Sequence, residues 1–466
     1  MIDTESPTKG IAEFIFNTSY EQLPDKAVQI AKTSIVDSIG TCIAGAESSP
    51  GRIIADYVRE RVSGPESTVI TKGFKTSAPE AALANGTMMH ALDYDDCADS
   101  FLGHPTTVIL PAVLSLGEWL GISGKDILLS YILGYDVCNK IGTGIDSTYY
   151  ETGWHSTATI GTLGAAVAAT KVLKLDVQQI RMAIGIAASL AGGLRQNFGT
   201  MTKSLHAGNA ARNGVFAALL AQKGFTADQG ILENPFGYSR VFSGTDKTNF
   251  KKMTGDLGAP FEIITSPPII KFYPSCRGTA GCIDAILHLI RLHDISAERV
   301  SEVECRTSSH TPKVLIHSRP RTALEGKFSL EYCMAVAIID KEVGLKQFTD
   351  EKVNDPKIQE LISKVRYTHP PEMGSTSADS MRGRVEVVVR FKDGTELSRL
   401  VEAAKGDPKN PLTEKEMESK FLDCAQVVFS RRDAKRILNE VSTLEHIKDV
   451  SVLMKLLNSP SGGNGV

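Results

Sequence analysis

The fold is decided by one stretch of small and apolar residues, Ile160-Gly161-Thr162-Leu163-Gly164-Ala165-Ala166. It lies inside a longer segment, residues 157–173, whose apolar positions recur at the three- and four-residue spacing of a helix face. Glycine and alanine on such a face let neighbouring helix axes approach closely. The apolar run is also shorter than the ~18 residues of a membrane-spanning helix. We therefore expect a buried helix inside a tightly packed helical body.

The same helical periodicity extends outward from this stretch in both directions. Turn and proline signals separate further helices, which we place at residues 26–44, 80–92, 111–120, 126–141, 177–191 and 208–222. The pattern returns after Pro411, at residues 414–429 and 433–441.

Between these helical regions the composition changes. Short β-branched runs predict strands at residues 261–264, 300–306, 384–391 and 396–401. A turn at Asp393-Gly394 would connect the last two strands in a hairpin. Helical patterns at residues 281–292 and 330–339 lie between them. The sequence therefore predicts a mainly α protein. Residues 1–260 and 402–466 form a large all-helical domain, and residues 261–401 form a smaller α+β domain inserted between them.

Composition excludes several classes of protein. The 466 residues carry 51 Lys and Arg against 54 Asp and Glu, a net charge of −3, whereas nucleic-acid-binding proteins carry a basic excess. No apolar run reaches the ~18 residues that cross a membrane, and residues 1–10 lack the order of a secretory signal. The eight cysteines are scattered and form no CxxC pair, which is typical of free thiols. We expect a cytoplasmic protein that binds neither nucleic acid nor membranes.

Polar clusters inside the apolar pattern carry the functional signal. The first cluster, residues 89–106, places four carboxylates and two imidazoles between two predicted helices. Charges crowded in this way perturb one another's pKa values, as acid–base chemistry requires. Two other interpretations stay open. One is a solvated interhelical loop, and the other is a metal site of His90, Asp93 and His104, although their spacing matches no standard zinc or di-iron pattern.

Three further clusters follow along the chain. His155 precedes an alanine-rich helix, whose positive end favours a neutral imidazole or binds an anion. Residues 193–212, interpreted as a loop, mix cationic and apolar side chains and are costly to bury unless anions meet them. Residues 269–279 contain Tyr273 and Cys276, but no thiol-protease or amidase signature surrounds the cysteine. The local excess of cations in the last two clusters indicates a polycarboxylate ligand.

The sequence resembles the MmgE/PrpD family at four places that follow in the family's order: residues 85–96, His104-Pro105, residues 202–211 and residues 273–276. The resemblance extends over about residues 10–450. It implies an all-helical domain built from both chain ends, a smaller α+β lid, a homodimer, and neither a cofactor nor a metal. It also implies small polycarboxylate substrates, with a bond made or broken at a carbon next to a carboxylate. Such a C–H is a weak acid, so the site needs a base and cations that stabilise the developing charge.

The resemblance also implies which residues form the site. The implied catalytic residues are Asp93, His104, His155, Lys203 and Tyr273. The implied substrate-binding residues are Arg195, His206, Ser275 and Arg277. Lys203 and Arg277 would bind substrate carboxylates, and Asp93 and His155 would carry protons with His104 as their polar partner.

Differences from the branches of the family bear on the reaction. Cys97 and Ile316 replace a threonine and a tyrosine of the decarboxylases, and Ala280 replaces a histidine that many relatives carry. The dehydratases have a longer stretch around their His-Pro. The resemblance therefore favours an epimerase that removes and returns a proton at a carbon next to a carboxylate of an iminodisuccinate-like substrate. The alternatives are a lyase resembling 2-methylcitrate dehydratase or cis-aconitate decarboxylase, and a carboxylate-binding protein without catalysis.

Overall fold

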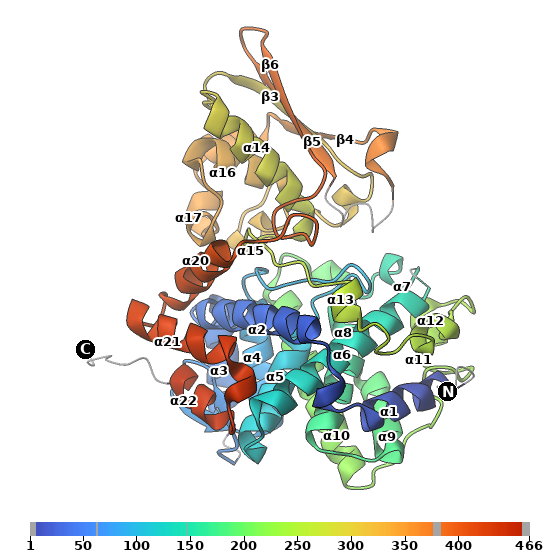
Figure 1. Cartoon of the computed structure of the whole chain (residues 1–466). Helices are drawn as coiled ribbons and strands as arrows, with labels where there is room; N and C mark the ends of the chain where they lie inside the picture. The colour runs from blue at the N-terminus through green and yellow to red at the C-terminus, as the bar shows by residue number, and fades with distance from the viewer. Residues whose placement is uncertain (1–5, 62–63, 147, 376–383, 459–466) are drawn as a thin grey trace. The chain divides into compact units, whose positions relative to one another are not determined.

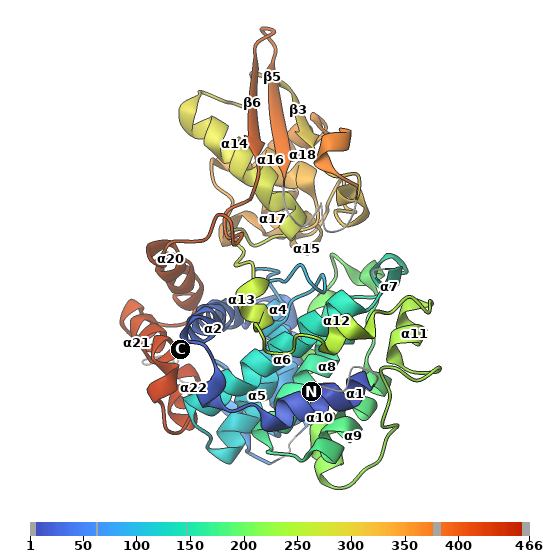
Figure 2. The same ribbon diagram turned by 45° about the vertical axis from the view of Figure 1, so that its right-hand side comes forward.

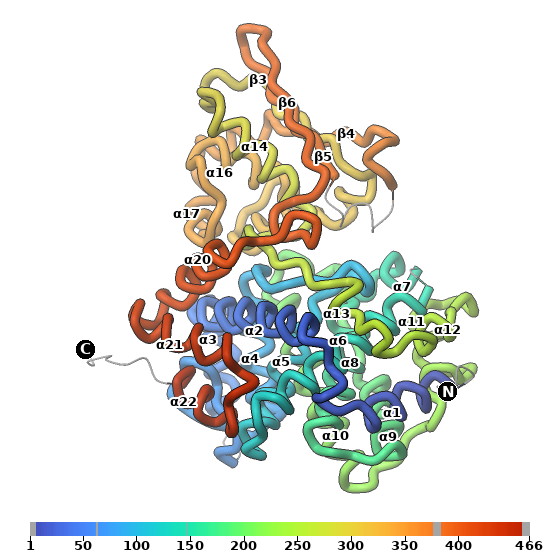
Figure 3. The backbone as a smooth tube through the Cα atoms, in the orientation of Figure 1, coloured from blue at the N-terminus to red at the C-terminus, as the bar shows by residue number. Residues whose placement is uncertain are grey.

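The computed structural model describes residues 6–61, 64–146, 148–375 and 384–458, and it divides into two compact units. The first unit combines Met1–Gln196, Thr202–Pro268 and Glu414–Val466, and the second combines Asn197–Met201 and Ile269–Thr413. The predicted domain boundaries, at residues 261 and 401, lie N-terminal to those of the second unit. Figure 3 traces the chain as it leaves the first unit after α13 (Glu262–Thr265) and rejoins it at α20 (Glu414–Ala425).

Helices make up most of the first unit. Its larger helices before α13 are α1 (Pro7–Asn17), α2 (Asp25–Gly45), α3 (Ser49–Arg59), α4 (Ala78–His90), α5 (Thr106–Leu120), α6 (Gly124–Gly144), α8 (Ser156–Val172), α9 (Val177–Leu190) and α10 (Met201–Gln222). Its smaller elements are β1 (Ser67–Val69), β2 (Phe74–Thr76), α7 (Thr148–Glu151), α11 (Tyr238–Ser243) and α12 (Phe250–Thr254). Every helix that periodicity predicts in this part of the chain is present.

Helix α8, which contains the deciding small-residue stretch, lies in the core and packs against α5, α6 and α9. A Cβ atom added at Gly164 would lie 2.1 Å from the Cys138 sulfur on α6, and one added at Gly161 would lie 3.0 Å from Val108 on α5. These two glycines are therefore required where the helix axes approach. Within the described ranges, no helix combines the length and apolar character needed to span a membrane.

The C-terminal helices return to the first unit. Figures 1 and 2 show α20, α21 (Arg431–Ser442) and α22 (Ser451–Asn458), all in red, with α20 and α21 beside the blue helix α2. Helix α2 packs against both α20 and α21, and α22 packs against α5 and β1. Both ends of the chain therefore build this unit.

The second unit contains a four-stranded sheet with the strand order β4-β3-β5-β6. Strands β3 (Val300–Arg306), β5 (Val385–Phe391) and β6 (Glu396–Val401) pair antiparallel, and β4 (Val365–Thr368) pairs parallel to β3. Helix α14 (Ala280–Leu292) packs on β5 and β6, and α16 (Leu330–Asp340) packs on α14. The shorter helices are α15 (Ala323–Gly326), α17 (Asp350–Val353) and α18 (Pro356–Ile362). The predicted class, mainly α with a smaller α+β part, is confirmed by the many helices and the small mixed sheet.

The strand predicted at residues 261–264 is wrong, because this segment forms the short helix α13. The carboxylate of Asp136 on α6 accepts hydrogen bonds from the backbone amides of Glu262 at 2.7 Å and Gly258 at 3.3 Å. An acceptor placed at the first turn satisfies an amide that has no partner inside the helix. The turn therefore forms despite the β-branched sequence.

The loop predicted at residues 193–212 is also wrong in its second half, because α10 begins at Met201. Lys203 and His206 therefore project from a helix. Gly208, where the predicted helix begins, lies inside α10, and a Cβ added there would lie 2.2 Å from both the Leu83 carbonyl oxygen and the Thr87 hydroxyl on α4. Gly208 is therefore a packing residue.

We expect Gly208→Ala to destabilise the protein, because the added methyl group would overlap the backbone of α4. Overpacking of this kind costs about 1–3 kcal/mol. The denaturation midpoint in guanidinium chloride measures the effect. Gly192→Ala is the matched control, since a Cβ at Gly192 meets nothing within 4 Å. Equal midpoints for the two variants would contradict the proposed close contact.

Candidate active site

The loop between α4 and α5 brings the acidic residues of the first cluster into the body of the first unit. His90 ends α4, the loop carries Asp93, Asp95 and Asp96, and His104 lies just before α5. The backbone amide of His104 donates to the Thr157 hydroxyl at 3.1 Å, which ties the loop to the first turn of α8. The side chains of His90 and the three aspartates are buried, and that of His104 is 12% exposed, so the cluster is not a solvated loop.

Asp95 fixes the tautomer of His90. The Nδ1 atom of His90 lies 2.9 Å from each carboxylate oxygen of Asp95. A carboxylate only accepts hydrogen bonds, so Nδ1 carries the proton and Nε2 presents its lone pair. That lone pair faces Lys203, whose Nζ lies 2.6 Å from His90 Nε2 and 2.9 Å from Asp93 Oδ1. The lysine therefore bridges an imidazole and a carboxylate.

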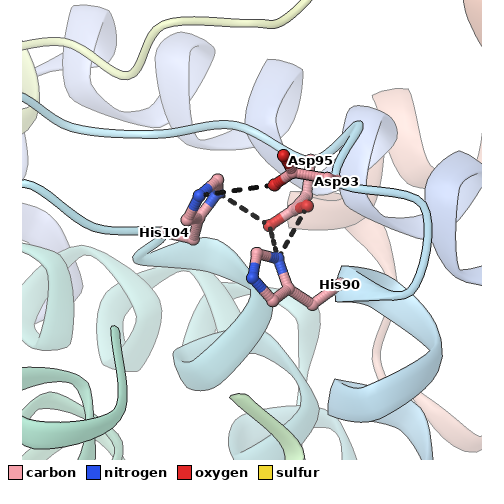
Figure 4. A group of neighbouring side chains, drawn as sticks. All are labelled: His90, Asp93, Asp95 and His104. Carbon is pink, nitrogen blue, oxygen red and sulfur yellow. Dashed lines mark hydrogen bonds and ion pairs between the residues drawn. The ribbon is translucent and has the colours of Figure 1, made fainter. Parts of the chain in front are cut away.

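His104 is oriented by the same carboxylate. Figure 4 shows dashed lines that run from the rings of both His90 and His104 to the aspartate carboxylates. The Nδ1 atom of His104 lies 2.8 Å from the Asp96 carbonyl oxygen and 3.1 Å from Asp95 Oδ2. Both partners are acceptors, so this Nδ1 also carries the proton. The remaining nitrogen, Nε2, lies 3.8 Å from Asp93 Oδ1.

A second pair of imidazoles adjoins the first. The Nδ1 atoms of His155, just before α8, and His206, on α10, lie 3.0 Å apart, so one donates and the other accepts. The backbone amide of His155 donates to the Gly193 carbonyl oxygen at 2.9 Å. The ring centroids of His155 and His90 are 6.1 Å apart, and those of His90 and His104 are 4.4 Å apart. Four imidazoles therefore form one contiguous group.

Burial and the nearby lysine favour the neutral form of three of these imidazoles, those of His90, His155 and His206. Burial lowers the pKa of His90 to about 4, despite the opposing effect of Asp95. Burial, followed by the charge of Lys203, lowers the pKa of His206 to about 4 and that of His155 well below its usual value. Burial raises the pKa of Asp95, but His90 and His104 outweigh it and hold that pKa well below its usual range.

Asp96 lies behind this group. Its Oδ2 accepts a 2.5 Å hydrogen bond from the Thr106 hydroxyl, which is itself 2.7 Å from the Tyr131 hydroxyl. Burial raises the pKa of Asp96 to about 8, with smaller contributions from Asp37 and Asp95. Burial therefore favours the protonated form of Asp96, whereas the two imidazoles favour the ionised form of Asp95.

The predicted binding residue Arg195 makes a local contact. Its Nη1 donates to the Tyr150 carbonyl oxygen at 2.8 Å, and its guanidinium carbon lies 4.0 Å from the centre of the Tyr150 ring. Arg195 therefore packs against Tyr150 of α7, which precedes His155 in the chain.

The other predicted residues lie in the second unit. Tyr273 donates to Asp284 Oδ1 at 2.6 Å, and Ser275 and Thr279 share a 2.8 Å hydrogen bond between their hydroxyls. Arg277 donates through Nη2 to Asp407 Oδ2 at 3.0 Å. Its side chain is buried, and its Nε and Nη1 have no hydrogen-bond partner among the described residues. These nitrogens are the feature of the second unit that best suits an anionic ligand.

Two domains of one protein family match most of the chain. Residues 9–251 match the MmgE/PrpD N-terminal domain, and residues 273–446 match the MmgE/PrpD C-terminal domain. The chain belongs to the MmgE/PrpD family.

Curated relatives of this MmgE/PrpD chain are lyases. A cis-aconitate decarboxylase of Mus musculus is 28% identical over 469 residues, which cover 98% of this chain and 94% of the relative. One of Aspergillus terreus is 29% identical over 475 residues, covering 97% and 96%. A mitochondrial 2-methylcitrate dehydratase of Yarrowia lipolytica is 22% identical over 427 residues, covering 85% and 79%. These relatives favour the lyase alternatives over the epimerase that the sequence analysis placed first.

In this MmgE/PrpD chain, His90 and Asp95 are functional candidates that the sequence-based assignment of catalytic residues left out. Both lie inside the first polar cluster, and His90 entered only the metal interpretation. The feature of the sequence that could have identified them is the high density of charged and imidazole side chains in this cluster. What the sequence does not show is that one carboxylate orients two rings, because that depends on the path of the loop.

Four side chains of the first polar cluster are of the types that bind metal ions. Ligand atoms of His90, Asp93, Asp95 and His104 lie within 4.8 Å of one another. However, the ammonium of Lys203 already contacts His90 Nε2 and Asp93 Oδ1. A divalent ion at these atoms would face that positive charge at close range, which is strongly unfavourable in a buried site. The donor set fits a lysine-centred site better than a metal site.

We expect the MmgE/PrpD chain to lose stability as the pH falls. The pKa values of His90 and His206 are lowered to about 4 in the folded chain. Between pH ~6.5 and ~4 the unfolded chain therefore binds more protons than the folded chain does. Between these two pH values, each such imidazole lowers the free energy of unfolding by about 1.4 kcal/mol for every unit by which the pH falls. Denaturation midpoints measured between pH 7 and 4 should fall accordingly.

The variant His206→Gln isolates one of these groups, and its midpoint should fall less steeply than that of the unsubstituted protein. The exposed His446 provides the control variant His446→Gln. Parallel pH profiles for all three proteins would contradict the assignment of a buried neutral imidazole at His206.

Proposed function

We propose that the chain is a lyase that acts on a small polycarboxylate of the cis-aconitate class. The observation that carries this proposal is the buried contact of the Lys203 ammonium with His90 Nε2 and Asp93 Oδ1, beside His104 and His155. A cation held among neutral imidazoles suits the binding of substrate carboxylates together with proton transfer at an adjacent carbon. The names of the relatives support the same reaction class.

The residues divide between two tasks in this proposal. In decarboxylation of cis-aconitate, the bond from carbon to one carboxylate breaks and CO₂ leaves. The released electron pair shifts through the double bond, and a proton is added at a carbon next to a remaining carboxylate. Lys203 would bind a carboxylate and stabilise the negative charge that develops on it. Asp93 and His104, whose oxygen and Nε2 face each other at 3.8 Å, would carry the proton, with His155 as a second proton carrier.

A dehydratase reaction would use the same groups in a different way. Loss of water from a hydroxy acid needs a base for the C–H and an acid for the leaving hydroxyl. A neutral imidazole and the lysine ammonium supply this combination. The epimerase would instead need proton carriers on both faces of one carbon, which the two imidazole pairs would have to provide.

The proposal is tested by incubating the purified protein with cis-aconitate in D₂O. We expect release of CO₂ and incorporation of one solvent deuteron into the product, observed by NMR. Parallel incubations use 2-methylcitrate, followed by loss of water, and iminodisuccinate stereoisomers, followed by deuterium exchange. Interconversion of the iminodisuccinate isomers without turnover of either tricarboxylate would overturn the lyase proposal and restore the epimerase.

Lys203→Met tests the central residue with a side chain of similar length. We expect kcat to fall about 10²–10⁴-fold, the range typical of groups that act in proton transfer and charge stabilisation. Steady-state kinetics separate this from a role in binding alone, which would raise KM and leave kcat nearly unchanged. Lys223→Met, at an exposed residue just after α10, is the control.

A further inference from the structure

The loop that carries the aspartates is held from the far end of the sequence. Lys420 on α20 and Asp37 on α2 form an ion pair with 2.6 Å between Nζ and Oδ1, and their side chains are 2% and 0% exposed. Both residues lie in the first unit. Neither belongs to the clusters that suggested the active site, so the pair calls for a separate explanation.

Lys420 also contacts the loop directly. Its Nζ donates to the Tyr94 carbonyl oxygen at 2.9 Å and lies 4.0 Å from the centre of the Tyr94 ring. Tyr94 stands between Asp93, which contacts Lys203, and Asp95, which orients His90 and His104. One ammonium therefore fixes both the main chain and the side chain of the residue that links these two carboxylates.

The backbone at Asp93 explains why such a contact is useful. Asp93 has a φ of 51°, in the left-handed region that side chains other than glycine rarely adopt. Residues persist in this region when the surrounding structure over-determines them, and they cluster at functional sites. The Asp93 amide donates to the His90 carbonyl oxygen at 3.2 Å on one side, and Lys420 holds the next carbonyl on the other.

We propose that Lys420, paired with Asp37, is a positioning residue that holds the Tyr94 carbonyl so that Asp93 keeps its left-handed turn and its contact with Lys203. The simpler explanation is that the ion pair only stabilises the fold. Buried ion pairs serve that purpose poorly, because apolar residues of similar volume often stabilise a fold as well or better. A role in shaping the loop accounts for both the pair and its contact with Tyr94.

Two double variants separate positioning from stability. Asp37→Asn with Lys420→Met removes both charges, so no buried charge is left without its partner, and it also removes the donor to Tyr94. Asp37→Asn with Lys420→Gln has the same net charge but keeps an N–H donor. We expect both to keep a denaturation midpoint close to that of the unsubstituted protein. The Met variant should lose kcat on the order of 10²-fold with a smaller change in KM, and the Gln variant should recover part of that loss.

Hydrogen–deuterium exchange of the backbone amides at residues 92–96 provides a readout that does not depend on the substrate. We expect faster exchange there in the Met variant than in the Gln variant, with other regions unchanged. Lys415→Met, at an exposed position of the same helix, is the control and should match the unsubstituted protein.

Unchanged exchange at residues 92–96 in the Met double variant, or equal kcat in the Met and Gln double variants, would overturn the positioning role. The kinetic arm rests on the proposed lyase function, whereas the exchange arm does not. An unsubstituted protein that turns over neither cis-aconitate nor 2-methylcitrate therefore rejects the function and leaves the positioning role to be decided by exchange.

Discussion

One buried carboxylate, that of Asp95, sets the orientation of the histidines around Lys203. It accepts hydrogen bonds from Nδ1 of both His90 and His104 and is fully buried, so water does not compete for it. Because both rings are held through Nδ1, both present Nε2 as the nitrogen available for chemistry. Lys203 takes its place against one of these nitrogens and Asp93 lies near the other. The rest of the site follows from this single constraint.

The packing of α4 against α10 brings His90 close to Lys203. A Cβ added at Gly86 on α4 would lie 2.9 Å from the Gly208 Cα on α10, so these two helices touch backbone to backbone. His90 follows Gly86 by one helical turn, and Lys203 precedes Gly208 by little more than one. The close approach of the glycines therefore sets the distance between His90 and Lys203. Larger side chains at the crossing would separate the lysine from its partners.

The sequence predicts the parts of this structure that depend on local pattern. The helical periodicity around Gly161 and Gly164 and the hairpin around Asp393-Gly394 are local signals, and the structure confirms both elements. The helical start of α10 escaped prediction because the predicted helix begins at Gly208, and polar residues before it, such as Lys203, indicate a loop unless their buried partners are known. The polar cluster at residues 89–106 showed where charged residues gather, but not that the pKa of Asp95 is lowered while that of Asp96 is raised. Lys420 lies 326 residues from Tyr94, and no local pattern connects them.

The positive charge of this site is carried by Lys203, and that has a consequence for catalysis in a lyase of the proposed kind. Burial and the lysine charge lower the pKa values of His155 and His206, so these rings are bases in the free protein. A polycarboxylate bound against Lys203 would bring negative charges beside the same rings. Opposite charges favour the protonated form of an imidazole, so substrate binding would raise these pKa values. The substrate itself would then help to convert a base into the acid that protonation of carbon requires.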